Sequence, residues 1–99
     1  MNKRLKPSQT KHDKTVRKVA GGYKSQGWNV HADVKGYPKP KTIFGNRPDV
    51  IAQKGKKLRI VEVETPSSYK SDRLQRGSFK RFASLNNKRK FRIKLTKRS

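Results

Sequence analysis

The sequence predicts an α/β domain whose elements follow the order αβββαβ, and three features of the chain support that prediction. Apolar and polar residues alternate along residues 28–34, which is the period of a strand with one covered face. Two β-branched runs, residues 49–53 and 58–64, flank a short glycine-centred segment, as in an antiparallel hairpin. Before and after these runs, apolar residues recur at helical spacing within residues 11–26 and 71–85.

The first predicted helix follows a basic segment. Residues 1–9 are polar and basic without periodicity, so we expect a flexible arm followed by one domain of residues 10–99. Thr10 and Asp13 resemble a capping pair at the start of the helix. The apolar face of the helix would consist of Val16, Val19, Ala20 and Tyr23.

A long loop and a second helix complete the predicted domain. Residues 35–48 hold three prolines and two glycines, which indicates a loop or a loose hairpin. Pro66 and Ser67 are expected to end the third strand, and a single second helix is expected to open near Ser71. The last strand, Phe91–Leu95, alternates apolar and basic residues, so one of its faces should be apolar.

The composition points to a polyanionic partner. The 28 Lys and Arg residues outnumber the 6 Asp and Glu residues, which gives a formal net charge of +22. Nucleic acid is the polyanion that best neutralises such a charge. A membrane surface is disfavoured as a partner, because the apolar runs are short and no helix pairs a wide apolar face with a basic one.

The lack of cysteine and the character of the N-terminal segment exclude some classes of protein. The chain has no cysteine, which excludes disulfides and thiolate zinc sites, and with them the zinc fingers. The basic N-terminal segment is followed by no apolar stretch, so it does not resemble a secretory signal. We therefore expect an intracellular, cytoplasmic protein.

The few acidic residues are concentrated in the predicted strands. Four of the six acids, Asp33, Asp49, Glu62 and Glu64, fall within or at the ends of strands, where charge is disfavoured unless it is paired or binds a metal ion. Glu62 and Glu64 leave the same face of one strand, and the hairpin would bring Asp49 beside them. Because like charges raise one another's pKa, a hard divalent cation, Mg²⁺ or Mn²⁺, would stabilise such a cluster.

Pro48-Asp49 followed by Glu62-Val63-Glu64 resembles the PD-(D/E)XK signature of a nuclease superfamily. The core of that family is an αβββαβ arrangement, the restriction-endonuclease-like fold, in which helices flank a mixed central sheet. The spacing is similar to that of archaeal Holliday junction resolvases. Gln75 with Phe79 resembles the QxxxY helix motif of some members, with Phe in place of Tyr. The resemblance covers about residues 11–96.

The resemblance implies specific roles for these residues. Asp49 and Glu62 would hold the metal ion, which activates a water and stabilises charge on the scissile phosphate. Glu64 stands where the motif has lysine, and a few restriction-type members are similar in using a glutamate there as base or metal ligand. Lys70, after the third strand, is an alternative source of the positive charge that the motif's lysine would provide. Asp13 would be the acid on the first helix, although its position also suits helix capping.

Basic and aromatic residues are interleaved in the predicted loop, which favours contact with phosphates and bases. Phe44 belongs to this interleaved loop. The residues expected to bind nucleic acid are Lys35, Tyr37, Lys39, Lys41, Arg47, Arg73 and Arg76. Four other aromatic residues fall at periodic positions and are expected in the core: Tyr23, Trp28, Phe82 and Phe91. His12 and His31 have no metal-ligand spacing between them, so the sequence assigns them no role.

Two functions remain open from the sequence. The first is a metal-dependent endonuclease acting on DNA, with structured or branched DNA among the candidate substrates. The second is a non-catalytic nucleic-acid-binding module, either a nuclease fold that has lost cleavage or a protein that binds ribosomal RNA. The clustered carboxylates favour the enzyme. Cutting both strands of a duplex or junction needs two opposed sites, so a homodimer is expected.

Overall fold

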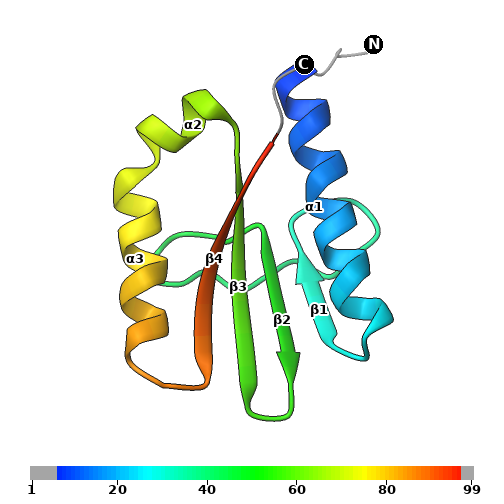
Figure 1. Cartoon of the computed structure of the whole chain (residues 1–99), viewed down its shortest axis with the longest axis vertical. Helices are drawn as coiled ribbons and strands as arrows, with labels where there is room; N and C mark the ends of the chain where they lie inside the picture. Colours follow the sequence, from blue (N-terminus) through cyan, green and yellow to red (C-terminus); the bar gives the residue numbers. More distant parts are fainter. Residues whose placement is uncertain (1–6, 97–99) are drawn as a thin grey trace.

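The computed structural model describes residues 7–96, and these residues form one mixed sheet with helices on both sides (Figure 1). The elements in chain order are α1 (Pro7–Ser25), β1 (Asn29–Ala32), β2 (Val50–Lys54), β3 (Lys57–Glu64), α2 (Pro66–Ser71), α3 (Arg73–Ser84) and β4 (Arg89–Leu95). The strand order in the sheet is β1-β2-β3-β4. The β1–β2 and β2–β3 pairs are antiparallel, and β4 runs parallel to β3 at the edge of the sheet.

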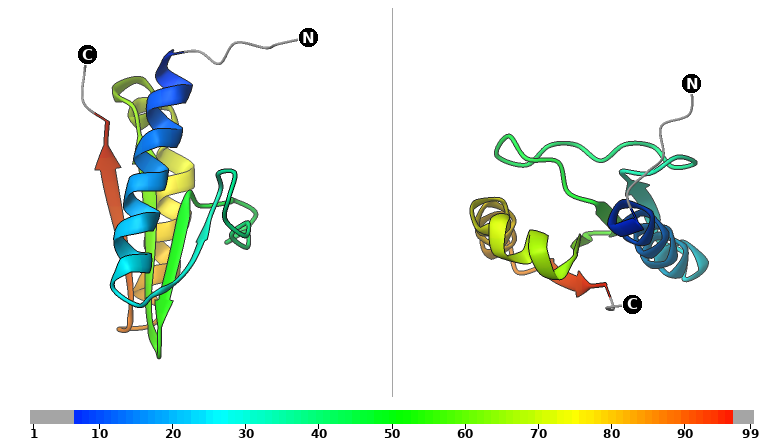
Figure 2. Two further views of the ribbon diagram at one scale, coloured as in Figure 1. Left: turned by 90° about the vertical axis from the view of Figure 1, so that its right-hand side faces the viewer. Right: turned by 90° about the horizontal axis from the view of Figure 1, so that it is seen from above.

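The helices divide between the two faces of the sheet. Figure 2 shows α1 on one side of the strands and α2 with α3 on the other. The loop of residues 33–49 leaves β1, crosses the α3-side face of the sheet as far as α3, and returns to β2 (Figure 1). Because successive side chains of a strand point to opposite faces, β3 serves both layers. Val61 and Val63 pack in the α1-side core, whereas Ile60 packs in the α3-side core.

Each layer has its own cluster of buried apolar side chains. The α1-side cluster consists of Val16, Ala20, Val30, Ala32, Val50, Ala52, Val61 and Val63. The α3-side cluster consists of Ile43, Ile60 and Phe79, with Ile51, Leu58, Phe82 and Phe91 packed against it. Tyr23 and Trp28 pack against the α1-side cluster, and Phe82 and Phe91 pack against the α3-side cluster. All four aromatic residues expected in the core therefore pack against one of the two clusters.

The predicted α/β class, with helices flanking a mixed sheet, is confirmed. The hairpin is confirmed as well: Lys54 pairs with Lys57 across a two-residue turn that begins with Gly55. Gly55 has a φ of +60°, which glycine adopts without the steric cost that a side chain would add.

The first helix begins at Pro7 rather than at Lys11. Proline suits the first turn of a helix, where its missing N–H has no partner to lose. Asp13 therefore lies inside the helix, so the predicted capping pair of Thr10 and Asp13 is wrong. Of the predicted flexible arm, residues 1–6 lie outside the described residues.

The predicted second helix is two helices that meet at Asp72. β3 ends at Glu64, just before Pro66 as expected, but the following helix already starts at Pro66 rather than near Ser71. Thr65 caps this helix, because its Oγ1 accepts from the Ser68 backbone N–H and the Ser68 hydroxyl accepts from the Thr65 N–H. The capping box turns the chain sharply after β3, which brings α2 and α3 back over the sheet.

The two outer strands differ from their predicted extents. β1 is shorter than expected and ends at Ala32, so Asp33 lies just beyond it. β4 begins at Arg89, and on its apolar face only Phe91 packs in a core. Ile93 and Leu95 are 39% and 52% exposed, and Figure 1 shows the C-terminal end of β4 leaning away from α3 toward the start of α1. None of the helices in residues 7–96 combines the length and apolar character that crossing a bilayer requires.

Phe79 should dominate the stability of the α3-side layer. It is fully buried, and its ring centroid lies 5.9 Å from that of Phe91. We expect Phe79→Ala to lower the free energy of unfolding by about 3–5 kcal/mol, as deletion of a buried aromatic ring usually does. Leu74→Ala on the same helix is the control, because Leu74 is 89% exposed and should change stability by less than about 0.5 kcal/mol. Urea denaturation of both variants measures the difference; similar losses would contradict this packing.

Candidate carboxylate site at the end of the β2–β3 hairpin

Asp49 and Glu62 face each other where β2 begins. The β2–β3 register pairs Val50 with Val61, which places Asp49 opposite Glu62. The Asp49 backbone N–H donates to Glu62 Oε1 at 2.9 Å, and the Val63 N–H donates to Asp49 Oδ2 at 2.8 Å. Each carboxylate is therefore oriented by the backbone of the neighbouring strand.

Glu62 is buried and hydrogen-bonded on both oxygens. Its side chain is only 1% exposed, and Gln75 of α3 donates Nε2–H to Oε2 at 2.7 Å. Burial and the nearby Asp49 raise the pKa of Glu62 to about 8, although the hydrogen bonds from the Asp49 backbone and Gln75 act to lower it.

His12 approaches Asp49 from α1. Its Nε2 lies 3.3 Å from Asp49 Oδ2 and its Nδ1 lies 3.2 Å from Asp13 Oδ1. The hydrogen bond to Asp49 raises the pKa of His12 to about 9 despite partial burial, so the ring is a cation at neutral pH. The two helices thus contribute one polar side chain each, His12 on Asp49 and Gln75 on Glu62.

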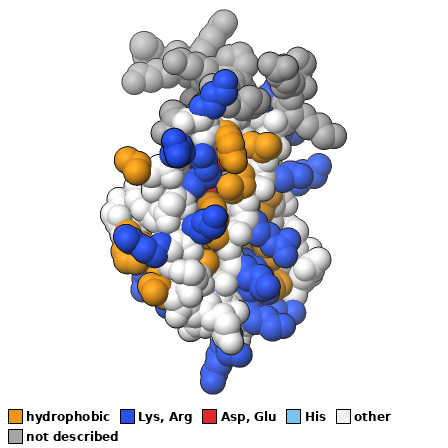
Figure 3. All heavy atoms as spheres, turned by 60° about the vertical axis from the view of Figure 1, so that its left-hand side comes forward, with side chains coloured by type: hydrophobic (Ala, Val, Ile, Leu, Met, Phe, Trp, Pro, Cys, Tyr) orange, Lys and Arg blue, Asp and Glu red, His pale blue; other side chains and the backbone are white. Residues whose placement is uncertain are grey.

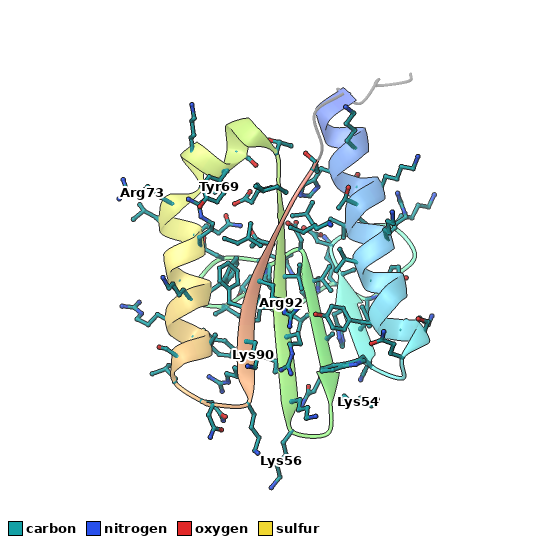
Figure 4. The ribbon with its side chains drawn as sticks, viewed as in Figure 1. Lys54, Lys56, Tyr69, Arg73, Lys90 and Arg92 are labelled. Carbon is teal, nitrogen blue, oxygen red and sulfur yellow. The ribbon has the colours of Figure 1, made fainter. Side chains whose placement is uncertain are left out.

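Glu64 is bound by side chains of α2 and α3. Ser68 donates its hydroxyl to Glu64 Oε1 at 2.9 Å, and Arg76 Nη1 lies 3.2 Å from Oε2. Burial raises the pKa of Glu64, as does the nearby Asp72, against the lowering effect of the bonds from Ser68 and Arg76. The Arg76 guanidinium also lies 4.0 Å from the ring centroid of Tyr69, which Figure 4 labels on α2.

The three predicted carboxylates lie on adjacent strands but do not share one set of partners. Asp49 and Glu62 are tied to each other through the backbone, while Glu64 is tied to Ser68 and Arg76. In the part of the chain that the structure describes, no three His, Asp or Glu side chains are grouped so that they could hold one metal ion. The arrangement that can take a cation is therefore the pair of Asp49 and Glu62.

Of the residues predicted to support the site, only some lie close to the carboxylates. Gln75 contacts Glu62 directly. Asp13 reaches the site only through His12. Lys70 is exposed on α2, and no contact joins it to the carboxylates within residues 7–96. Asp33 is exposed, although its backbone N–H donates to the Asp49 carbonyl at 2.8 Å.

Some residues expected to bind nucleic acid are used inside the protein. Tyr37 packs against the α1-side core and Lys24 lies 5.7 Å from its ring centroid, so it differs from the exposed aromatic that the loop composition suggested. The side chain of Arg76 is 12% exposed and is paired with Glu64. Those that remain exposed are Lys35, Lys39, Lys41, Arg47 and Arg73. Phe44 is 51% exposed, with its ring 6.2 Å from that of Phe82.

Sequence reasoning missed His12 and Ser68. A lone histidine gives no spacing signal, and its contact with Asp49 joins residues that are 37 positions apart. The signal available for Ser68 was the Thr65-x-x-Ser68 spacing of a capping box, which also places the hydroxyl beside Glu64.

The metal-free protein should lose stability as the pH rises. Folding raises the pKa of Glu62 from 4.5 to about 8 and that of His12 from 6.5 to about 9, so the folded state favours both protonated forms. This stabilisation is complete below the ordinary pKa of each group and is lost as the pH passes the raised value. Thermal melts in chelator should therefore show a Tm that falls from about pH 5 to about pH 9.

Two variants test the origin of that pH dependence. Glu62→Gln cannot ionise and should flatten the profile, leaving the smaller contributions of His12 and Glu64, whose pKa values folding also raises. Asp33→Asn removes an exposed acid and should keep the native slope. A Tm that rises over the same interval would contradict the assignment.

Comparison with known proteins adds no relative. No protein-family model matches this chain, and a search of curated proteins found no match.

Proposed function

We propose that this protein is a metal-dependent endonuclease that hydrolyses phosphodiester bonds in DNA, on a restriction-endonuclease-like core. The observation that carries the proposal is the opposed pair of Asp49 and Glu62, contacted by His12 from one helix and Gln75 from another. The chain has a net charge of +22 and only 6 acids, yet two of those acids meet at this junction. Paired carboxylates beside a cationic surface suit a phosphate-cleaving site.

The carboxylate pair fits a hard divalent cation. Mg²⁺ is usually bound by one or two carboxylates, with waters and substrate phosphates completing its octahedral coordination. Asp49 uses Oδ2 for both Val63 and His12, so its Oδ1 has no hydrogen-bond partner within residues 7–96. Asp49 Oδ1 and the carboxylate of Glu62 would supply the protein ligands to Mg²⁺ or Mn²⁺. Such an ion supplies an activated water and charge neutralisation at a scissile phosphate.

The surrounding residues set the orientation and charge of that pair. Gln75 holds the Glu62 carboxylate in one rotamer through its bond to Oε2. His12 is protonated at neutral pH and offsets the charge of Asp49, while the pKa of Glu62, raised to about 8, keeps Glu62 mostly neutral until a metal ion displaces its proton. When a phosphate approaches, the same imidazolium is available to attract it.

Arg76 supplies the cation that the motif's lysine would provide. Glu64 stands at the lysine position of the resembling family, and its Oε2 lies 3.2 Å from Arg76 Nη1. The guanidinium is always charged and is fixed between Glu64 and the Tyr69 ring. In this proposal Glu64 positions Arg76, and β3 therefore does not need the lysine of the motif.

The surface around the site suits a polyanionic substrate. Figure 3 shows the α3 side of the molecule, where Lys and Arg side chains are spread across the surface and acidic side chains are visible only in one small area between them. Arg73 at the start of α3 is exposed, and Figure 4 shows it pointing away from the sheet. Phosphate contacts from such residues would position DNA across the carboxylates without reading its sequence.

One observation favours the second candidate, a non-catalytic nucleic-acid-binding module. Both oxygens of Glu62 and both oxygens of Glu64 already accept hydrogen bonds from protein groups. Every member of this network has a partner without any metal ion, as in a polar core kept for its shape. A nuclease fold without cleavage, or a protein that binds ribosomal RNA, would retain the basic surface and this network.

The nuclease proposal includes a homodimer. One chain offers one pair of opposed carboxylates, whereas cleavage of both strands of a duplex or a junction requires two sites in opposed orientation. A twofold axis between two copies provides that arrangement with identical interfaces. Sedimentation of the protein with and without junction DNA measures whether it is a monomer or a dimer.

Metal binding should depend on the carboxylate pair. We expect Asp49→Ala and Glu62→Ala each to abolish Mn²⁺ binding in calorimetry and to abolish nicking of plasmid and junction DNA. Affinity for DNA in chelator should stay near the native value, because the basic surface is intact. Asp33→Ala is the matched control, since it removes an exposed acid whose side chain lies outside the pair.

Retention of native Mn²⁺ affinity by both variants would remove the metal site. A native protein that cuts no DNA or RNA with either metal, yet binds both tightly, would make the binding module the better account.

The Glu64–Arg76 pair should behave as one unit in catalysis. We expect Glu64→Gln and Arg76→Gln each to lower turnover by about 10²-fold or more, the range usual for a positioned charged group. The double variant should be little worse than either single variant, because each already breaks the same interaction. Mn²⁺ affinity should change little in all three.

Single-turnover cleavage gives the rates for these variants. Full activity of Arg76→Gln alongside an inactive Glu64→Gln would mean that Glu64 acts directly as a base or ligand and that Arg76 is dispensable.

A further inference from the structure

A second basic surface lies on the face of the sheet opposite to Glu62 and Glu64. α1 packs on β1, β2 and β3 and leaves this face of β4 open. The parallel register pairs Lys90 with Arg59 and Arg92 with Val61, so these β4 side chains face the α1 side. Figure 4 shows Lys90 and Arg92 along β4, and both side chains are exposed.

Two adjoining hollows follow this face. The first has a volume of about 470 Å³ and lies between α1 and the sheet, with Lys18, Tyr23, Trp28, Arg59 and Arg92 among its lining residues. The second has a volume of about 240 Å³ and is lined by Lys57, Arg59, Asn87, Lys88 and Lys90. Arg59 lines both hollows, so they adjoin at its side chain, and together they are called the groove. No acidic side chain lines either of them.

The groove contains a planar platform as well as positive charge. The Arg59 guanidinium carbon lies 5.3 Å from the Trp28 ring centroid, and the Tyr23 ring meets the indole edge-on at 5.3 Å. Arg59 is held by bonds from Nη1 to the Leu58 and Lys88 carbonyls. A nucleobase can stack on a guanidinium plane or an indole, and both are only partly buried here.

We propose that this groove binds a single-stranded segment of nucleic acid. Lys18, Lys90 and Arg92 would contact successive phosphates, and the Arg59–Trp28 platform would stack a base. A single strand suits the groove better than a duplex, because a duplex keeps its bases stacked inside and offers only phosphates to such a platform. The groove lies across the sheet from the carboxylate pair and does not require that the pair bind metal or cleave DNA.

Trp28 gives a direct readout, since it is the chain's only tryptophan. We expect a short oligothymidine to quench Trp28 fluorescence in a saturable titration of the native protein, in chelator and at about 0.1 M salt. In the Lys18→Glu/Arg92→Glu variant, affinity measured by this quenching should fall by about tenfold or more. The slope of log K against log salt should become less steep by about 1.4, for two lost single-strand phosphate contacts.

The control carries the same change of charge on the other side of the sheet. Lys80→Glu/Arg81→Glu replaces one exposed lysine and one exposed arginine of α3, and it should leave the quenching affinity within about threefold of native. Equal losses in the two variants would mean a general effect of net charge and would overturn the proposal. Quenching of equal affinity by a duplex or by inorganic polyphosphate would overturn the single-strand assignment.

Folding and catalysis are separated from this test. Melting curves establish that each variant folds; should Lys18→Glu/Arg92→Glu fail to fold, Lys18→Gln/Lys90→Gln replaces it, with Lys80→Gln/Arg81→Gln as control. Unchanged quenching by the replacement variant would overturn the proposal. Because chelator is present throughout, an inactive carboxylate site would leave these results unchanged, and a cleaving protein without the quenching would fail this inference alone.

Discussion

The burial of two glutamates on β3 is the constraint on which the rest of this structure depends. β3 is covered by helices on both faces, so Glu62 and Glu64 are removed from water, at 1% and 2% exposure. A buried carboxylate is costly unless hydrogen bonds satisfy it, and its partners here come from β2, α2 and α3. The hydrogen bonds that satisfy Glu62 and Glu64 therefore depend on the register of the β2–β3 hairpin, on the capped turn at Thr65 and on the position of α3 against the sheet.

The same requirement separates the charges of the molecule. Asp49 and Asp13 meet at His12, Glu62 lies opposite Asp49, and Asp72 lies close enough to Glu64 to raise its pKa. Five of the six acids are thus gathered at one end of the sheet, while the α1-side groove has none. Two surfaces result from one chain: a mixed-charge site suited to metal-assisted chemistry on phosphate, and a purely cationic groove suited to holding a polyanion.

Local patterns predicted the strands and the hairpin because their causes are local. Alternation along β3, a glycine turn and apolar spacing are all read from neighbouring residues. Gln75 was predicted only from its resemblance, with Phe79, to a family motif, and it contacts Glu62. Contacts set by the angle between elements were not predictable in this way. The approach of His12 to Asp49 depends on how α1 crosses the sheet, and the pairing of Arg76 with Glu64 depends on the break between α2 and α3 at Asp72. Composition alone made Arg76 and Tyr37 look like surface residues.

Under the proposed nuclease function, Arg76 would take the part of the lysine that the resembling motif has at the position of Glu64. A lysine on β3 would have to remain charged next to Glu62 in a buried strand, and burial lowers the pKa of lysine. Glu64 instead forms an ion pair with Arg76 of α3 at the edge of the sheet, and arginine stays protonated there. The cation then comes from a helix rather than from the strand, and its position depends on the Tyr69 ring and on the capped turn at Thr65. The Glu64–Arg76 ion pair therefore places a permanent cation at the α3 edge of the sheet without burying a lone ammonium group in β3.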